Sequence, residues 1–419
     1  MISKDVIKTL IAENQREVQN KPLIERPYVI EDALNYVFVG LRRAGKSYLM
    51  YQQIQKLLRT GHSTDEILYF NFEDDRLPAL VLSDLDLLKT CYEEMYHCRP
   101  LFFLDEIQIV DGWEKFARRL ADQGYRVFIT GSNAKMLSSE IATTLGGRYV
   151  IKNVYPFSFP EFLNAQGIDM SDKNAVYKFH LEITKNYETY FRFGGLPELT
   201  KISTKREWLS NLYQKLFFGD LVSRYQIRND HALRVLVRKL AESIKQPSSF
   251  NRLANVVSAA GKKISTDTVI DYLGYLKESW MIFAIENYCA KLADKEANKK
   301  YYFVDNGLLN LFLFDANTSL LENQVAIRLR QQYGDELHFF QGRTEVDFYL
   351  PESKIAIQVT YSMQDIDTRQ REIEGLAELS RSFEIEKYLI ITKDEEETIT
   401  KSNIEIQVIP VRKWLLDNS

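Results

Sequence analysis

Hydrophobic residues in the first third of the chain form short continuous runs, separated by stretches of more polar sequence. Such runs are typical of parallel strands that are buried on both faces. The segment Tyr48–Leu58 instead places apolar residues at the three- and four-residue spacing of a helix. The pattern therefore predicts an α/β domain with a parallel sheet. We expect its strands at Tyr36–Val39, Glu66–Phe72, Leu101–Leu104, Tyr125–Thr130 and Arg148–Tyr155.

A glycine-containing loop stands between the first of these strands and the helix. Residues 40–47 fit G-x-x-x-x-G-K-[ST] in the strand–loop–helix context that this pattern requires. Inward-facing N–H groups and the helix N-terminus make such a loop a site for phosphate oxygens, whereas a basic turn is the alternative. We expect Lys46 to reach the β- and γ-phosphates and Ser47 to bind magnesium. The predicted nucleotide contacts are Gly40, Arg42, Arg43, Ala44, Gly45, Lys46, Ser47 and Tyr48.

Two carboxylates follow the apolar run Leu101–Leu104. Asp105 stands where a strand-end aspartate organises magnesium in phosphate-loop folds, and Glu106 comes next. A carboxylate at this place can accept a proton from the attacking water or orient it, so we predict Glu106 as the general base. The alternative is that the pair caps a helix beginning near Asp111.

Small polar residues end the next predicted strand. Ser132 or Asn133 could hold the attacking water there, with Asn133 preferred, because ligands of open α/β sheets gather at the carboxyl edge. A turn that caps the following helix is the alternative. Arg148 is a candidate finger acting on a neighbouring subunit's γ-phosphate. Its rivals are Arg42, Arg43, Arg118 and Arg119.

These segments together resemble the prokaryotic AAA-superfamily ATPases that carry a C-terminal domain of unknown function. The resemblance lies in Gly40–Ser47, Leu104–Gln108, Thr130–Asn133, Gly147–Arg148 and Tyr155–Phe162, and nearly the whole chain is covered. It implies ATP and Mg²⁺ as cofactors, and an AAA-type fold with an additional strand between the two Walker strands, here at Ile67–Phe72. By resemblance, Lys46, Ser47, Asp105 and Glu106 are the Walker residues, and Asn133 or Ser132 is the first sensor.

The middle of the chain is helical and aromatic. Residues 158–228 contain the turn Gly194–Pro197 and are either a lid over the nucleotide or helices packed beside the sheet. Residues 229–305 predict helices at His231–Ile244, Leu253–Ala260 and Ser265–Glu278, followed by strands at Trp280–Ile285 and Lys300–Val304.

Three helices and a two-stranded ribbon outline a winged helix. Lys262 and Lys263 would then lie beside DNA phosphates, with the third helix in the major groove. That helix carries Asp267, Asp271 and Glu278, however, and these acids would face a polyanion. The sequence therefore favours a winged-helix fold more strongly than direct recognition of DNA by its third helix.

The last segment, residues 306–419, resembles a small α/β restriction-endonuclease-like fold. Glu322 on a helix, Asp347 on one strand and Gln358 on the next stand where such folds bind magnesium. The lysine expected two residues after Gln358 is replaced by Thr360, although Lys354 could reach in. We therefore predict a degenerate site without cleavage activity.

Composition sets few further limits. The 419 residues are 45% hydrophobic and 27% charged with a formal net charge of −4, so any DNA contact must come from a local patch. The N-terminus has no signal-peptide pattern and no apolar run approaches a membrane span, so we expect a cytoplasmic protein without membrane contact. Three cysteines and five histidines show no metal-ligand spacing.

The sequence thus predicts four segments: an ATPase domain at 1–157, a helical lid or connector at 158–228, a winged-helix-like domain at 229–305 and the endonuclease-like domain at 306–419. The leading hypothesis is an ATP-hydrolysing switch or motor that couples its nucleotide state to a partner, with DNA and protein both open and self-association allowed. An ATP-regulated nuclease and an ATP-timed protein-binding regulator are the alternatives. The biological process stays open.

Overall fold

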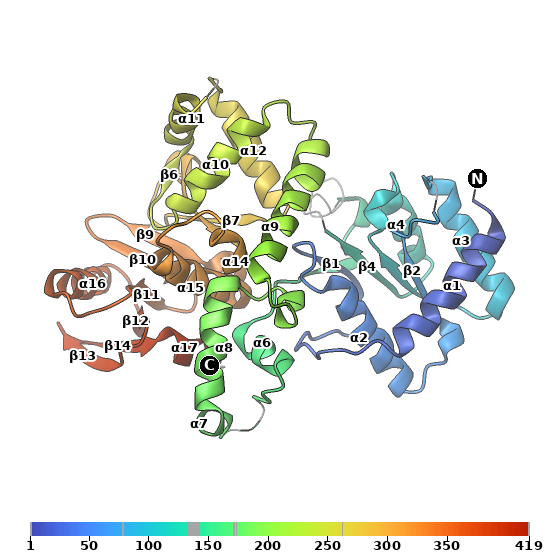
Figure 1. Ribbon diagram of the computed structural model, residues 1–419, viewed down its shortest axis with the longest axis horizontal. Coiled ribbons are helices and arrows are strands. Elements are labelled where there is room, and N and C mark those ends of the chain that lie inside the picture. The colour runs from blue at the N-terminus through green and yellow to red at the C-terminus, as the bar shows by residue number, and fades with distance from the viewer. Residues whose placement is uncertain are drawn as a thin grey trace. The chain divides into compact units, whose positions relative to one another are not determined.

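The computed structural model describes residues 2–77, 79–132, 143–170, 172, 174–261 and 263–417. The chain forms two compact units, Met1–Tyr155 and Pro156–Ser419 (Figure 1). The first unit ends at Tyr155, two residues before the predicted end of the ATPase domain at 157. Within the described residues, no helix is long and apolar enough to cross a membrane.

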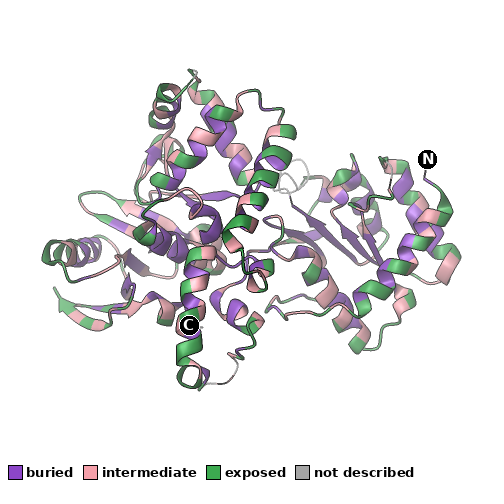
Figure 2. Ribbon diagram, viewed as in Figure 1, coloured by how far each residue is buried: buried purple, intermediate pink, exposed green. Residues whose placement is uncertain are grey.

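The first unit is built on a five-stranded sheet of order β2-β3-β4-β1-β5 in which all neighbours are parallel. The predicted parallel-sheet core is therefore confirmed. Strands β1 to β4 are buried along most of their length, whereas β5 is buried only at Tyr149 (Figure 2). Within this core Phe103 stacks on Phe128 at a centroid distance of 4.6 Å. The strands are β1 Asn35–Val39, β2 Ile67–Asn71, β3 Leu101–Asp105, β4 Val127–Gly131 and β5 Tyr149–Asn153.

Helices flank this sheet: α1 Lys4–Gln19, α2 Lys46–Arg59, α3 Leu82–Tyr96 and α4 Trp113–Asp122, with 3₁₀ turns at Thr64–Glu66 and Ile107–Ile109. Helix α1 packs against β2 and α3 and buries Ile7, Leu10 and Ile11. The sequence reasoning did not predict this helix. Ser3 caps it by accepting a hydrogen bond from Asp5 N, a local signal that was present in the sequence.

The second unit begins with helices, as expected. They are α6 Phe159–Ala165, α7 Ala175–Lys178, α8 His180–Phe193 and α9 Lys205–Lys215, with a 3₁₀ turn at Pro197–Thr200. Helix α9 continues as a π-helix over Leu216–Ser223. Ser158 and Glu161 form a reciprocal cap that fixes the start of α6.

A three-stranded antiparallel sheet of order β6-β8-β7 follows, with three helices before its last two strands. In chain order the elements are α10 Asp230–Glu242, β6 Ser248–Ser249, α11 Phe250–Ala259, α12 Thr266–Glu278, β7 Ile282–Glu286, α13 Leu292–Ala297 and β8 Asn298–Phe303. The two-residue strand β6 and the helix α13 were not predicted, because neither has enough residues to show a period.

The unit ends in a mixed six-stranded sheet of order β13-β14-β12-β11-β10-β9. A core cluster that includes Val346, Leu376 and Ile390 packs between this sheet and α16. The elements are α14 Asn306–Leu309, α15 Asn317–Tyr333, a 3₁₀ turn Gly334–Glu336, β9 His338–Gln341, β10 Glu345–Leu350, β11 Ile355–Val359, α16 Ile366–Leu379, β12 Lys387–Thr392, β13 Glu397–Lys401, β14 Ile404–Pro410 and α17 Val411–Leu416. Helical and small-sheet domains thus follow the parallel-sheet core.

Candidate nucleotide site

The glycine-containing loop connects β1 to α2, as its motif requires. Its backbone is in the left-handed region at Arg43 (φ 65°) and at Gly45 (φ 97°), which precedes the first residue of α2. Gly40 meets a different constraint, because a Cβ there would lie 2.1 Å from the carbonyl oxygen of Val154. The chain therefore needs glycine at 45 for its conformation and at 40 for close packing.

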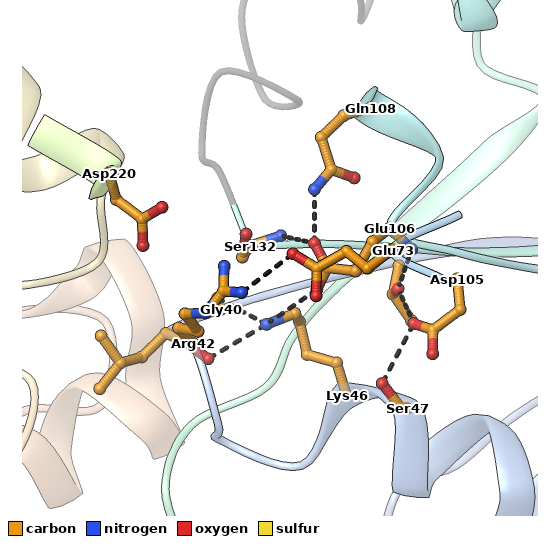
Figure 3. A network of polar contacts seen from close by, with 12 residues as sticks. Gly40, Arg42, Lys46, Ser47, Glu73, Asp105, Glu106, Gln108, Ser132 and Asp220 are labelled. Carbon is orange, nitrogen blue, oxygen red and sulfur yellow. Dashed lines mark hydrogen bonds and ion pairs between the residues drawn. The ribbon is translucent and has the colours of Figure 1, made fainter. Parts of the chain in front are cut away.

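Lys46 lies within the curl of the loop (Figure 3). Its Nζ donates to the carbonyl oxygens of Gly40 and Leu41, each at 3.1 Å, and stands 3.8 Å from Oε1 of Glu106. Burial lowers the pKa of Lys46, while the carboxylates of Glu106 and Asp105 act in the opposite direction. A buried cation at a helix start is suited to bind phosphate oxygens.

Asp105 ends β3 and is buried, with both carboxylate oxygens in use. Oδ1 accepts hydrogen bonds from Ser47 Oγ at 3.1 Å and from Thr130 Oγ1, and Oδ2 accepts one from Tyr69 OH at 2.6 Å. Burial is the main cause of the raised pKa of Asp105, followed by the neighbouring Glu106. The two predicted magnesium ligands, Ser47 and Asp105, are thus in direct contact.

The donor set fits magnesium. A carboxylate and a hydroxyl are oxygen ligands of the kind Mg²⁺ prefers, and this ion usually takes its remaining ligands from water and substrate phosphates. Within the described part of the chain, no group of three histidine, cysteine or acidic side chains could hold a metal. Ser47 and Asp105 would supply two ligands, with water and nucleotide phosphates as the others.

Glu106 is the other carboxylate of this edge. It adopts a left-handed conformation (φ 56°), and its backbone N–H donates to Thr130 Oγ1 at 2.9 Å. Its Oε2 accepts hydrogen bonds from the backbone N–H of Ser132 at 3.3 Å and from the Gln108 side chain. The carboxylate therefore lies beside Lys46, and it caps neither the 3₁₀ turn Ile107–Ile109 nor α4.

Sequence reasoning missed two residues of this site, Thr130 and Tyr69. Thr130 joins both acids, since its hydroxyl contacts Asp105 and the N–H of Glu106. Tyr69 also lies 3.1 Å from the hydroxyl of Tyr51. No local pattern in the sequence marks them, because their place near Asp105 arises from the pairing of β2 and β4 with β3.

The other predicted site residues lie in several places. Ser132 contacts Glu106, whereas Asn133 lies outside the described residues. Arg148 immediately precedes β5 and pairs with Asp122, at the amino end of a sheet whose carboxyl end holds Lys46 and Asp105. The structure therefore does not bring Arg148 to this site, and a role on a neighbouring subunit stays a prediction.

Arg42 lies in the same polar network as Lys46 (Figure 3), whereas Arg118, Arg119 and Tyr48 contact other residues of the first unit. Arg42 pairs with Glu73 at 2.9 Å, and Arg119 pairs with Asp86. Arg118 lies 3.7 Å from Asp122. The ring of Tyr48, 47% exposed, packs edge-on against Tyr51.

In the second unit, the three residues of the predicted degenerate site do come together. Gln358 accepts a hydrogen bond from the N–H of Asp347 and donates to the carbonyl of Glu345, each at 2.9 Å. Glu322 accepts one from Tyr302 OH at 2.8 Å, and burial raises the pKa of Glu322 to about 8.

The buried lysine of this cluster is Lys300, which was not identified from the sequence. Its Nζ lies 3.2 Å from Asp347 and 3.7 Å from Glu322. The suggestion that Lys354 reaches in is wrong, because Lys354 pairs with Glu384 and Glu386.

Comparison with known proteins gives two family matches. Residues 34–163 match the model of an AAA domain, and residues 184–319 match a domain of unknown function, DUF8612. The chain is 33% identical to the uncharacterized protein MJ1544 of Methanocaldococcus jannaschii, over 99% of this chain and 96% of that one. It is 28% identical to an uncharacterized protein of Haemophilus influenzae, over 95% and 100%.

A solved structure, the Walker-type ATPase PABY2304 of Pyrococcus abyssi, matches over 74% of this chain and 96% of that one. Its identity is 12% and its TM-score is 0.42. The AAA match covers the phosphate loop, both strand-end acids and Ser132. The first unit therefore carries a P-loop AAA-type ATPase domain, as the sequence resemblance implied.

Proposed function

Since the chain belongs to the same family as the M. jannaschii protein MJ1544 and carries an AAA domain, we propose that it binds ATP with Mg²⁺ and hydrolyses it. The observation that carries this proposal is the convergence of Lys46, Ser47, Asp105 and Glu106 at one sheet edge. In this proposal ATP turnover is a switch that controls binding of a partner by the second unit.

Each side chain has a definite part in the proposed reaction. Lys46 and the loop N–H groups hold the phosphates, while Ser47 and Asp105 hold Mg²⁺, which supplies charge neutralisation on the phosphate oxygens. Glu106 orients the attacking water and accepts its proton. Tyr69 and Thr130 fix the carboxylate of Asp105, so that its oxygens keep their direction when the nucleotide binds.

We propose a winged helix for residues 229–305. Three helices combined with a β6-β8-β7 sheet, in which the last strand lies in the middle, support it. The third helix, α12, exposes Asp267, Ile270 and Asp271. Two carboxylates on that face would repel DNA phosphates, which favours a protein partner over DNA for this helix. Lys263 is exposed beside it, and Lys262 lies outside the described residues.

The test measures ATP turnover by the wild-type chain and by Lys46→Ala, each with and without duplex DNA. Neutral pH and Mg²⁺ are used, because the proposal assumes a cytoplasmic protein. Turnover that requires Lys46 and is indifferent to DNA supports an ATPase with a protein partner. Turnover stimulated by DNA would overturn the choice of partner but keep the ATPase. Equal phosphate release by Lys46→Ala would overturn the ATPase itself.

A further inference from the structure

A fully buried lysine lies within the acidic cluster of the second unit. The side chain of Lys300, on β8, has no exposed surface. Its Nζ lies 3.0 Å from Glu345 Oε1 and 3.2 Å from Asp347 Oδ1, with Glu322 Oε1 at 3.7 Å. A buried ammonium is costly unless carboxylates pair with it, and here Glu345 and Asp347 are the two close partners.

Several oxygens that a divalent ion would use accept hydrogen bonds from donors of the chain, in addition to facing the ammonium of Lys300. Asp347 Oδ2 accepts a hydrogen bond from the N–H of Val359 at 2.9 Å, and Glu322 accepts one from Tyr302. The carbonyl oxygen of Gln358, a second candidate ligand, accepts the N–H of Asp347.

Access is also closed on one side of the cluster. Glu322 is 2% exposed and Gln358 is 3% exposed, so a phosphodiester cannot reach their oxygens in this arrangement. Asp347 is 15% exposed, and Glu345 is the acid that solvent reaches most, at 44%. A nuclease centre must admit both a metal ion and a strand of nucleic acid, and the buried ammonium of Lys300 and the burial of Glu322 and Gln358 oppose both.

We propose that Lys300 is the resident cation of this cluster and takes the position that a divalent ion holds in a nuclease. The four residues Lys300, Glu322, Glu345 and Asp347 then form a charge lock. The lock joins β8 of the three-stranded sheet to α15 and to β10 of the six-stranded sheet, needs no metal and cleaves no nucleic acid. This inference does not depend on ATP hydrolysis by the first unit.

The test compares the urea midpoint of Lys300→Met with that of Lys299→Met. Lys299 is a matched control, because it stands next on the same strand and also forms two ion pairs, with Glu286 at 2.8 Å and Glu296 at 3.1 Å. Its partners are 34% and 65% exposed, so water can replace the lost lysine. We expect the midpoint to fall at least roughly twice as far in Lys300→Met, because Glu322 and Asp347, 2% and 15% exposed, stay buried without a cation.

A double variant makes the test specific for charge. In Lys300→Met with Asp347→Asn, the new amide oxygen can still accept from Val359 N–H, and a carboxylate left without its cation is removed. We therefore expect the midpoint to recover by more than half of the loss. Equal effects of the two single variants would overturn the lock. If Lys300→Met does not fold, a folded double variant supports the lock and an unfolded one overturns it.

Nicking of supercoiled plasmid in Mg²⁺ or Mn²⁺ tests the absence of cleavage. We expect none from the wild-type chain. Nicking that persists in Lys46→Ala and disappears in Asp347→Asn would make this cluster a nuclease centre and Lys300 its catalytic lysine. That outcome would leave the proposed ATPase untouched, because Lys46 belongs to the other site.

Discussion

Asp305 should make the second unit less stable as pH rises. Its side chain, 2% exposed, accepts hydrogen bonds from the N–H groups of Gly195 at 2.8 Å and Gly307 at 2.9 Å. The backbone N–H of Leu308 is a third donor to this carboxylate. Burial raises the pKa of Asp305 to about 6.

The sign and size follow from linkage. A carboxyl whose folded pKa lies above its unfolded pKa binds its proton more tightly in the native state, so stability falls as pH rises between the two values. A shift from 3.8 to about 6 corresponds to about 3 kcal/mol once the group is ionised in both states. Between roughly pH 4.5 and 7.5, about 2 kcal/mol of this should be lost.

The perturbation is Asp305→Asn. The asparagine side chain does not ionise in this pH range and keeps one acceptor oxygen for the backbone N–H groups. Urea unfolding of both proteins across this pH range, followed by tryptophan fluorescence, gives the comparison. Three of the four tryptophans, Trp208, Trp280 and Trp414, belong to the second unit. The stability of the parent minus that of the variant should fall by about 2 kcal/mol from low to high pH. A difference that is flat or rises with pH would refute the reasoning.

Three further predictions concern both units. Lys46→Ala should abolish ATP binding in calorimetry, because no other side chain of the loop replaces its buried ammonium; retained affinity would contradict the phosphate-loop assignment. Tyr69→Phe removes the 2.6 Å hydrogen bond to Asp105, so the Mg²⁺ concentration for half-maximal ATP turnover should rise roughly fivefold, with little change in the turnover rate at saturating Mg²⁺. An unchanged half-maximal Mg²⁺ concentration would exclude a positioning role for Tyr69. Gly195→Ala places a Cβ 2.1 Å from the carbonyl oxygen of Phe157 and should cost about 1–3 kcal/mol of stability. Gly274→Ala is the control, because its Cβ meets nothing within 4 Å and the change should be neutral or stabilising. Equal melting temperatures of the two variants would contradict this geometry.

The sequence was sufficient for the parallel-sheet core because its signals are local. The apolar runs gave all five strands, and the motif at residues 40–47 is defined by the close packing at Gly40 and the left-handed turn at Gly45. The strand-end position of Asp105 followed from the length of the run before it.

Contacts between distant segments could not be obtained in this way. Lys300 stands 47 residues from Asp347 and on a strand of another sheet, so no spacing rule links them. Thr130 and Tyr69 were hidden for a similar reason, since their importance arises from the order β2-β3-β4. Asp305 was missed because its partners are backbone N–H groups, one of them 110 residues away.

ATP hydrolysis by Glu106→Gln is the most direct test of the proposed ATPase. Glutamine keeps the size of the side chain but cannot accept the proton of the attacking water, so we predict nucleotide affinity near that of the parent and turnover lower by roughly a hundredfold or more. Hydrolysis at the parent rate would contradict the account, and another group would then have to position the water.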